Sequence, residues 1–236
     1  MIKLSVNVIY KHLTNIINFS IRKGIFPELT KIAIIKPIYK NPKDVSKLDK
    51  TLYRPVSVLS GFSKNFERYY LNSMLDHVNK IISKYISAYR KGHSCQNVLL
   101  KLTEEWRHNL DQNKVVGALL IDLSNAFDCL PHDLLIAKLD AYGFEKETIN
   151  LLFSYLTKRK QWVRIKDNMS DFLEILSGVP QGSILGPILF NIFLNDMLMF
   201  TTTTNPNNYA YDNTLSAAEN YVSNLIKLFK KGEKKL

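Results

Sequence analysis

The apolar residues of this chain recur at helical spacing in some stretches and run together or alternate in others. A stripe at helical spacing covers Leu4 to Arg22, which is followed by Gly24, and another covers Ser60 to Ile82. Because side chains three or four positions apart share one face of a helix, both stretches predict amphipathic helices, the first ending at a glycine cap. The same pattern predicts helices over residues 97–110, 131–141, 145–156, 183–199 and 219–231.

Shorter apolar stretches predict β-strands. Val115 to Ile121 is apolar throughout, which is typical of a strand buried inside a sheet. A β-prone run over residues 31–40 ends at a break over residues 41–44. Two alternating stretches around Asp167 and Asn168 predict a hairpin over residues 161–176, and residues 209–215, after a loop over 201–208, predict two short strands around a tight turn. Helices and strands follow one another without a regular strand–helix–strand repeat, so the predicted fold class is α+β.

The composition allows one large domain or two intergrown ones, since 236 residues are enough to bury a core. Lys and Arg total 32 against 21 Asp and Glu, which gives a formal net charge of +11. This excess favours a polyanionic partner, either nucleic acid or an anionic membrane, although a soluble protein can also be basic without such a partner.

Cysteine and histidine add no site of their own. Cys95 and Cys129 lie far apart, and the 5 histidines show no metal-ligand spacing, so no disulfide partner and no zinc site is predicted. No apolar run is long enough to span a bilayer, and the first residues do not resemble a signal peptide. We expect an intracellular protein of the nucleus or the cytoplasm that does not act in a membrane.

A carboxylate ends the apolar run at Asp122. In isolation this residue fits the N-cap of a helix or a turn. It fits a magnesium ligand equally well, because a hard cation prefers carboxylate and carbonyl oxygens. In two-metal phosphoryl transfer, carboxylates from separate strands converge on one point. On that interpretation the hairpin over 209–215 supplies the second carboxylate, Asp212.

Three segments resemble motifs A, B and C of a reverse transcriptase palm, in the family's order and spacing. They are Val115–Asp128, Gly178–Pro187 and Asn208–Thr214. Further stretches resemble the reverse transcriptases of non-LTR (LINE-type, jockey-like) retrotransposons, and these cover residues 24–27, 53–59, 90–94 and 212–215. The resemblance extends from about Gly24 to Leu225.

The resemblance implies the fingers and palm of a right-hand polymerase, with an antiparallel palm sheet packed on helices. Fingers would comprise residues 1–114 and 142–177, and the palm residues 115–141 and 178–236; the chain would end before the thumb. The implied reaction is nucleotidyl transfer by an RNA-directed DNA polymerase. It adds deoxynucleoside triphosphates to the 3′-OH of a DNA primer on an RNA template, with two Mg²⁺ ions.

The resemblance also assigns roles in the metal site. Asp122, the main-chain carbonyl of Leu123 and Asp212 would hold the metal ions. Motif C normally carries two aspartates, and Tyr211 occupies the place of the first. A phenol with a pKa near 10 is neutral at physiological pH and is a poor magnesium ligand, so we expect impaired activity.

Five further residues would bind the nucleotide. Lys40 and Arg54 would contact the triphosphate, since an arginine fork donates two parallel bonds to phosphate oxygens. Phe127 would lie beneath the sugar and exclude a ribose 2′-OH, although a single Phe is often only a core residue. Gln181 would lie against the nucleotide, and Gly182 would let the backbone approach the template.

Two rival functions remain open at this point. One is a catalytically dead remnant that still binds nucleic acid, which Tyr211 favours. The other is a different palm polymerase, either a group II intron maturase or an RNA-dependent RNA polymerase. Phe127 argues against the RNA polymerase, because that class usually carries an aspartate at this position.

Overall fold

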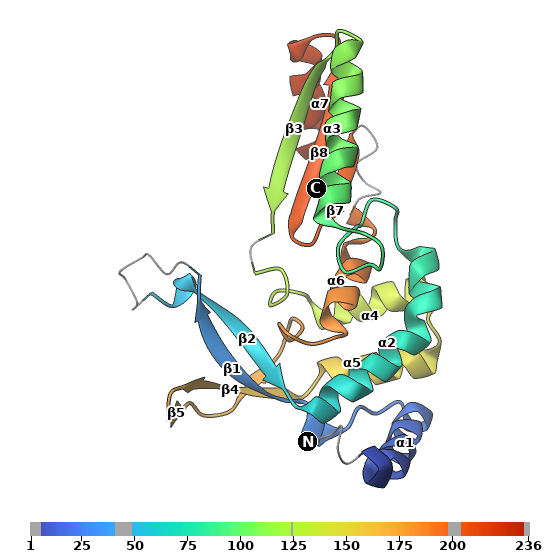
Figure 1. Ribbon diagram of the computed structural model, residues 1–236, viewed down its shortest axis with the longest axis vertical. Helices are drawn as coiled ribbons and strands as arrows, with labels where there is room; N and C mark the ends of the chain where they lie inside the picture. Colours follow the sequence, from blue (N-terminus) through green and yellow to red (C-terminus); the bar gives the residue numbers. More distant parts are fainter. Residues whose placement is uncertain (1–5, 41–48, 124, 198–203, 234–236) are drawn as a thin grey trace. The chain divides into compact units, whose positions relative to one another are not determined.

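The computed structural model describes residues 6–40, 49–123, 125–197 and 204–233, which form two compact units (Figure 1). The first unit comprises residues 1–77 and 127–190, and the second comprises residues 78–126 and 191–236. The predicted break over residues 41–44, the start of the loop predicted over 201–208 and the outermost ends of the helices predicted over 4–22 and 183–199 lie outside the described residues. The division into fingers and palm stays a prediction, and each unit is described here by itself.

The first unit is built on a 5-stranded sheet with the order β2-β1-β4-β5, in which β6 also pairs with β4. Strand β1 runs antiparallel to β2 and parallel to β4. The strands are β1 (Ile32–Tyr39), β2 (Tyr53–Leu59), β4 (Arg159–Ile165), β5 (Asn168–Met169) and β6 (Leu173–Ile175). The helices are α1 (Val6–Lys23), α2 (Gly61–Ile81, in this unit to residue 77), α4 (His132–Ala141), α5 (Lys146–Leu156) and the first half of α6 (Gly186–Leu194), with 3-10 turns at Glu28–Thr30 and Lys50–Leu52.

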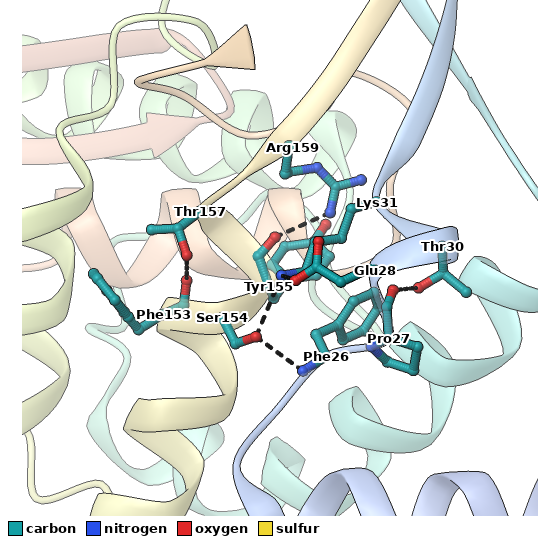
Figure 2. Close-up of polar contacts among 10 residues, drawn as sticks. All are labelled: Phe26, Pro27, Glu28, Thr30, Lys31, Phe153, Ser154, Tyr155, Thr157 and Arg159. Carbon is teal, nitrogen blue, oxygen red and sulfur yellow. Dashed lines mark hydrogen bonds and ion pairs between the residues drawn. The ribbon is translucent and has the colours of Figure 1, made fainter.

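Aromatic packing holds the core of this unit together. The buried ring of Phe26 packs edge-on against Tyr155 and Phe66, with ring centroids 5.0 and 6.1 Å apart. Such edge-to-face pairs add to the stabilisation that comes from burying the rings. Ser154 links the start of the cluster to β1: its Oγ accepts from the backbone N–H of Phe26 and from the Nζ of Lys31 (Figure 2).

The second unit contains a 3-stranded antiparallel sheet with the order β3-β8-β7. Its strands are β3 (Val115–Asp122), β7 (Asn205–Tyr209) and β8 (Asp212–Glu219), and its helices include α3 (Cys95–Asp111) and α7 (Val222–Glu233). Helix α7 covers one face, where Gly117 of β3 lies directly against Leu225. Helix α3 covers β7 on the other face, where Lys101 donates to Asn207 and Glu105 accepts from Asn205. The predicted antiparallel sheet packed on helices, and the α+β class, are confirmed.

Most predicted helices and strands are present within a few residues of their expected ends. Helix α1 ends as predicted at Gly24, whose φ is +61°. The N–H of Gly24 donates to Ile21 and that of Ile25 donates to Ser20, which is the bonding pattern of a Schellman cap. The predicted hairpins are also present, as β4 with β5 and as β7 with β8.

Two predictions about this second sheet are wrong. Strand β3 does not lie inside a sheet but at its edge, and Leu120 is 75% exposed. Residues 205–208, predicted as loop, form part of β7. Their polar side chains carry no strand signal, because the strand is stabilised by pairing with β8 and by hydrogen bonds from α3. The sequence pattern contains neither contribution.

Candidate active site

Asp122 and Asp212 stand directly opposite each other at the ends of two neighbouring strands (Figure 1). Strands β3 and β8 run antiparallel, and their register pairs these two aspartates. Residues directly opposite in an antiparallel pair point to the same face, with Cβ atoms about 4.5–5.5 Å apart. Both side chains are exposed. The prediction that the two aspartates lie close together on adjacent strands is therefore confirmed.

The pairing continues one residue beyond the aspartates. The backbone N–H of Leu123 donates to the carbonyl of Tyr211 at 3.3 Å. Because hydrogen-bonded and non-hydrogen-bonded pairs alternate, Asp122 and Asp212 form a non-hydrogen-bonded pair, in which side chains approach most closely. Two like charges facing each other destabilise a sheet unless a cation lies between them. The arrangement therefore suits a divalent cation bound by the two carboxylates.

A two-residue turn, Ala210 and Tyr211, joins β7 to β8 and carries the second aspartate at its end. Ala210 has a φ of +58° and Tyr211 is not among the residues with positive φ, which is the φ pattern of a type II′ hairpin turn. Two buried asparagines hold the turn: Asn208 donates to the carbonyl of Ala210 at 2.9 Å, and Asn213 donates to the carbonyl of Tyr211 at 3.1 Å. These hydrogen bonds from asparagine side chains to the carbonyls of the turn fix the position of Asp212.

The other edge of this hairpin is also held. The backbone N–H of Asn208 donates to Tyr85 at 2.9 Å, and Asn208 accepts from the N–H of Ser87 at 3.1 Å. These bonds form a parallel bridge between Asn208 and Ile86, which is fully buried. The hairpin is therefore fixed between β3 on one side and residues 85–87 on the other. A fixed frame of this kind suits a site that must hold two carboxylates at a set separation.

In the first unit, the segment Gly178–Gly186 forms a strand-to-helix connection around a buried carboxylate. Glu67 of α2 is fully buried, and its Oε2 accepts from the backbone N–H groups of Ile184 at 2.6 Å and Leu185 at 3.1 Å. Burial raises the pKa of Glu67, and these two N–H groups partly offset that rise. The carboxylate therefore orders the residues that lead into α6.

Gly182 in the same connection has a φ of +122° and lies against β2. A Cβ at this position would come within 2.7 Å of the carbonyl oxygen of Ser57. Beside it, the carbonyl of Gln181 accepts from the N–H of Ser57 at 2.7 Å. The close approach that requires glycine here is to β2; an approach to the template remains a prediction.

The side chain of Gln181 bonds to Asp128, the last residue of the segment that resembles motif A. Its Nε2 donates to the Oδ2 of Asp128 at 2.9 Å. Burial raises the pKa of Asp128, and the bond from Gln181 opposes that rise. The two residues, with Pro55 and Ser57 of β2, line a hollow of about 240 Å³. This hollow lies within the first unit and places Gln181 beside the strand that carries Arg54.

Comparison with known proteins decides the family. Residues 39–234 match the family model described as reverse transcriptase (RNA-dependent DNA polymerase). The chain belongs to the reverse transcriptase family. The predicted resemblance to the reverse transcriptases of non-LTR retrotransposons is confirmed by relatives from mobile elements.

Two of these relatives come from Drosophila melanogaster. The chain is 34% identical over 188 residues to the probable RNA-directed DNA polymerase from transposon BS, which is 79% of this chain and 20% of that protein. It is 31% identical over 191 residues to the RNA-directed DNA polymerase from mobile element jockey, which is 80% of this chain and 20% of that protein. The chain thus spans about a fifth of the length of these curated relatives.

The fold also matches that of a solved structure. The structure of apo telomerase from Candida tropicalis, truncated from its C-terminal domain, matches with a TM-score of 0.64 over 98% of this chain and 50% of that chain. The sequence identity is 14%, so the likeness shows the fold alone. The predicted right-hand polymerase fold is confirmed.

The predicted triphosphate contacts lie on the β1–β2 arm of the reverse transcriptase domain. Arg54 is exposed and pairs in register with Ile38, so Lys40, two residues beyond Ile38, follows on the same face. The Nζ of Lys40 donates to the carbonyl of Thr51 at 2.8 Å. Lys40 follows the end of β1 directly, and Arg54 lies on the neighbouring strand β2; the contact of the two cations with a triphosphate stays a prediction.

Phe127 is a core residue of the first unit. Its side chain is 5% exposed and packs on Phe190, with ring centroids 5.1 Å apart. Its carbonyl accepts from the N–H of Val179 at 2.7 Å, which ties the end of motif A to motif B. The packing role is therefore observed, and the sugar-discriminating role stays a prediction.

The described residues contain no cluster of metal ligands, no disulfide and no membrane-spanning helix. Within them, no three His, Cys, Asp or Glu side chains gather as a metal site, so the candidate ion site rests on two carboxylates and main-chain oxygen. Cys95 and Cys129 are free thiols at the surface. Across the described ranges, no helix combines the length and the apolar character needed to cross a membrane.

Sequence reasoning missed three residues, each of which supports a motif segment within its own unit. Glu67 lies between the apolar residues of a helical stripe, where it gave no signal of its own. The asparagines at 208 and 213 lie in the segment that resembles motif C, and the resemblance assigns a role to neither. One feature of the sequence could have indicated these three polar residues: they adjoin apolar residues that the hydrophobic pattern places in the core. A buried polar group without a hydrogen-bond partner is costly there, so each of them is expected to have a partner.

Proposed function

We propose that the chain is the polymerase core of a retrotransposon reverse transcriptase that adds deoxynucleotides to a primer 3′-OH on an RNA template. The observation that carries the proposal is the register of Asp122 with Asp212 at one end of an antiparallel sheet. Both carboxylates lie on the part of the sheet face that α3 leaves exposed, beside Leu120. That open strip gives a primer end access to the carboxylates.

The residues present fit a divalent ion. Asp122, Asp212 and the main-chain carbonyl of Leu123 would hold magnesium, and the two facing carboxylates share one exposed face. When bound, such ions would activate the attacking hydroxyl and stabilise the leaving oxygen. Tyr211 supplies no carboxylate at the place where motif C of the family normally carries one. The site therefore holds its ions weakly, and polymerisation is slow.

The nucleotide would be held by residues of the first unit. Lys40 and Arg54 share one face of the β1–β2 arm and would bind the triphosphate through charge-assisted hydrogen bonds. Gln181 borders the hollow next to β2 and would orient the nucleotide. The buried ring of Phe127 would form the floor beneath the sugar and disfavour a ribose 2′-OH.

A second candidate is a nucleic-acid-binding remnant without polymerase activity. Tyr211 favours it, because a neutral phenol neither attracts nor ligates magnesium well. The net charge of +11 would still supply affinity for a polyanion. The two candidates differ in the role of Asp122: the polymerase requires its carboxylate for primer extension, and the remnant does not use it in catalysis.

Primer extension on poly(rA) with an oligo(dT) primer tests the proposal. We expect slow extension that requires the RNA template and Mg²⁺, that uses dTTP in preference to UTP, and that is abolished by Asp122→Asn. The exposed Asp111→Asn provides a control with the same loss of charge in the same unit. Absence of extension by both the chain and its Tyr211→Asp variant, with both folded, would favour the remnant.

A further inference from the structure

A fully buried arginine begins β4 in the first unit. Arg159 is the largest of the fully buried side chains in the described ranges. Its guanidinium lies over the ring of Tyr155, 4.8 Å from the ring centroid, and its Nη1 donates to the carbonyl of Tyr155 at 3.0 Å (Figure 2). A charge inside a protein is costly unless an opposite charge or hydrogen bonds compensate it. Arg159 therefore requires a compensating group.

The end of α5 compensates Arg159 only in part. Tyr155 belongs to the last turn of α5, where the carbonyls have no partner within the helix and where a cation interacts favourably with the helix dipole. This contact uses Nη1 alone. Among the described residues, the Nε and Nη2 atoms of Arg159 have no hydrogen-bond partner. Capping of α5 thus does not account for the whole guanidinium.

A buried carboxylate supplies the opposite charge. Glu67 of α2 is fully buried, like Arg159. Burial raises the pKa of Glu67, the two backbone N–H groups that it accepts lower it, and the charge of Arg159 lowers it further. Both charges also act on the hydroxyl of Tyr155: burial raises its pKa, Glu67 adds to the rise and Arg159 opposes it. No direct ion pair joins Glu67 to Arg159 within the described part of the chain, so the attraction acts through space, close to Tyr155.

A second buried cation in this region does not serve Glu67. Lys31, which precedes β1, is 2% exposed. Its Nζ donates to the Oε1 of Glu28 at 2.9 Å and to the Oγ of Ser154 at 3.3 Å (Figure 2). Lys31 therefore has a carboxylate of its own, and Arg159 is the cation that acts on Glu67.

The charge of Glu67 matters because of what its carboxylate holds. Its Oε1 accepts from the Oγ of Ser63 at 3.1 Å, and its Oε2 accepts from the N–H groups of Ile184 and Leu185. Hydrogen bonds to an ionised carboxylate are roughly twice as strong as bonds to a neutral acceptor. A buried carboxylate without a compensating charge takes up a proton instead. A cation that keeps Glu67 ionised therefore strengthens the bonds that order the segment between Gln181 and α6.

We propose that Arg159 is a positioning residue for nucleotide binding: it keeps Glu67 ionised, and Glu67 holds the connection that carries Gln181. This inference rests on the proposed function, in which Gln181 orients the nucleotide. Arg159 is fully buried, so it acts on the nucleotide only through the backbone that Glu67 holds. An arginine that only capped α5 would have no effect there.

Hydrogen exchange at the backbone amides of Ile184 and Leu185, measured by NMR on the full chain at neutral pH, tests the first step. Arg159→Met should lower the protection of both amides about tenfold or more, because two charge-assisted bonds become neutral ones. Arg159→Lys keeps the positive charge and should retain most of the protection. The control Lys31→Met removes the other buried cation and should leave both amides protected. This measurement requires neither nucleotide nor polymerase activity.

A double-mutant cycle with Glu67→Gln separates positioning from capping. In a chain that already carries Glu67→Gln, Arg159→Met should have little further effect on either amide. If Arg159→Met alone does not fold, Glu67→Gln/Arg159→Met should still fold, because removing both charges leaves neither unpaired. Equal losses of protection with and without Glu67→Gln would overturn the proposal. So would unfolding of the double variant beside a folded Glu67→Gln.

Titration with a labelled deoxynucleoside triphosphate tests the second step. Arg159→Met should weaken binding by less than the loss of about tenfold that follows removal of a direct phosphate contact. Arg159→Lys should restore the affinity. Unchanged affinity in Arg159→Met, beside a loss in Arg54→Ala, would overturn the role of Arg159 alone. No binding by the wild-type chain would overturn the proposed function and the nucleotide role of Arg159 with it, and the amides would still decide whether Arg159 acts through Glu67.

Discussion

The buried carboxylate of Glu67 in α2 accepts a hydrogen bond of 2.6 Å from the backbone N–H of Ile184. The neighbouring N–H of Leu185 donates to the same oxygen. One side chain from a distant helix thus satisfies the backbone donors that precede α6. In this way the packing of α2 fixes the connection that carries Gln181 and Gly182.

Replacing Glu67 by alanine should destabilise the fold. The substitution leaves two backbone N–H groups without their acceptor, and each such group costs roughly 1–3 kcal/mol when it stays buried. Urea unfolding of Glu67→Ala should therefore show a lower free energy of unfolding than the wild-type chain. Glu104→Ala, which removes an exposed carboxylate from α3, should leave it within about 0.5 kcal/mol. Equal losses would mean that Glu67 does not hold the connection.

The pH dependence of stability should report on Glu67. Burial raises its pKa above the usual 4.5, so the folded state binds the proton more tightly than the unfolded state. The stability that Glu67 contributes is then fully present below the unfolded pKa and is lost as pH rises through the folded pKa. Glu67→Gln should lack this loss, so its unfolding free energy relative to wild type should rise as pH increases above 4.5. A relative stability that falls over that range would contradict the raised pKa.

Gly182→Ala should destabilise the chain more than Gly143→Ala does. Both glycines have positive φ, of +122° and +76°, so an added Cβ strains the backbone at either position. Only at Gly182 would the Cβ also meet a neighbour, the carbonyl oxygen of Ser57 at 2.7 Å. Separating the Gln181 carbonyl from the N–H of Ser57 should cost about 1 kcal/mol more. Urea unfolding that gives equal losses for the two variants would show that β2 can move away freely.

Arg54→Ala should weaken nucleotide binding without weakening the binding of a single strand. A lost charge-assisted contact to a phosphate costs about tenfold or more in affinity. The matched control is Arg68→Ala, which removes an exposed arginine from α2 in the same unit and should leave nucleotide binding unchanged. Fluorescence titration with a labelled deoxynucleoside triphosphate and with oligo(rU) separates the two effects. Equal losses on both ligands for Arg54→Ala would mean that Arg54 is not a triphosphate contact.

The pairing of Asp122 with Asp212 was predictable from the sequence, because both end strands in motifs whose order and spacing are distinctive. The edge position of β3 was not predictable, since the apolar run Val115–Ile121 has the pattern of a central strand. Strand β7 was missed for a similar reason: its asparagines are stabilised by α3 and β8, and no periodicity encodes those partners. Glu67 was missed because its partners lie far away in the chain.

We expect Tyr211 to lower the polymerase activity of the domain. Its main-chain carbonyl accepts from the N–H of Leu123 and from the side chain of Asn213, and Tyr211→Asp retains that carbonyl. The added carboxylate would adjoin Asp212 and give the ion site a third acidic ligand. Each ~1.4 kcal/mol of lost transition-state stabilisation lowers a rate tenfold, and a pair of bound metal ions contributes several kcal/mol of that stabilisation. We therefore expect the chain as it stands to be some thousandfold slower than an intact relative.

The most direct test is the rate of primer extension on poly(rA) with oligo(dT) and dTTP, measured for the chain, for Tyr211→Asp and for Tyr211→Asp/Asp122→Asn. Thermal unfolding of all three proteins verifies that each is folded. The account predicts slow extension by the chain, a rate for Tyr211→Asp that is at least tenfold higher, and no extension by the double variant. Fast extension by the chain that Tyr211→Asp does not increase would contradict it, because Asp122 and Asp212 would then suffice alone.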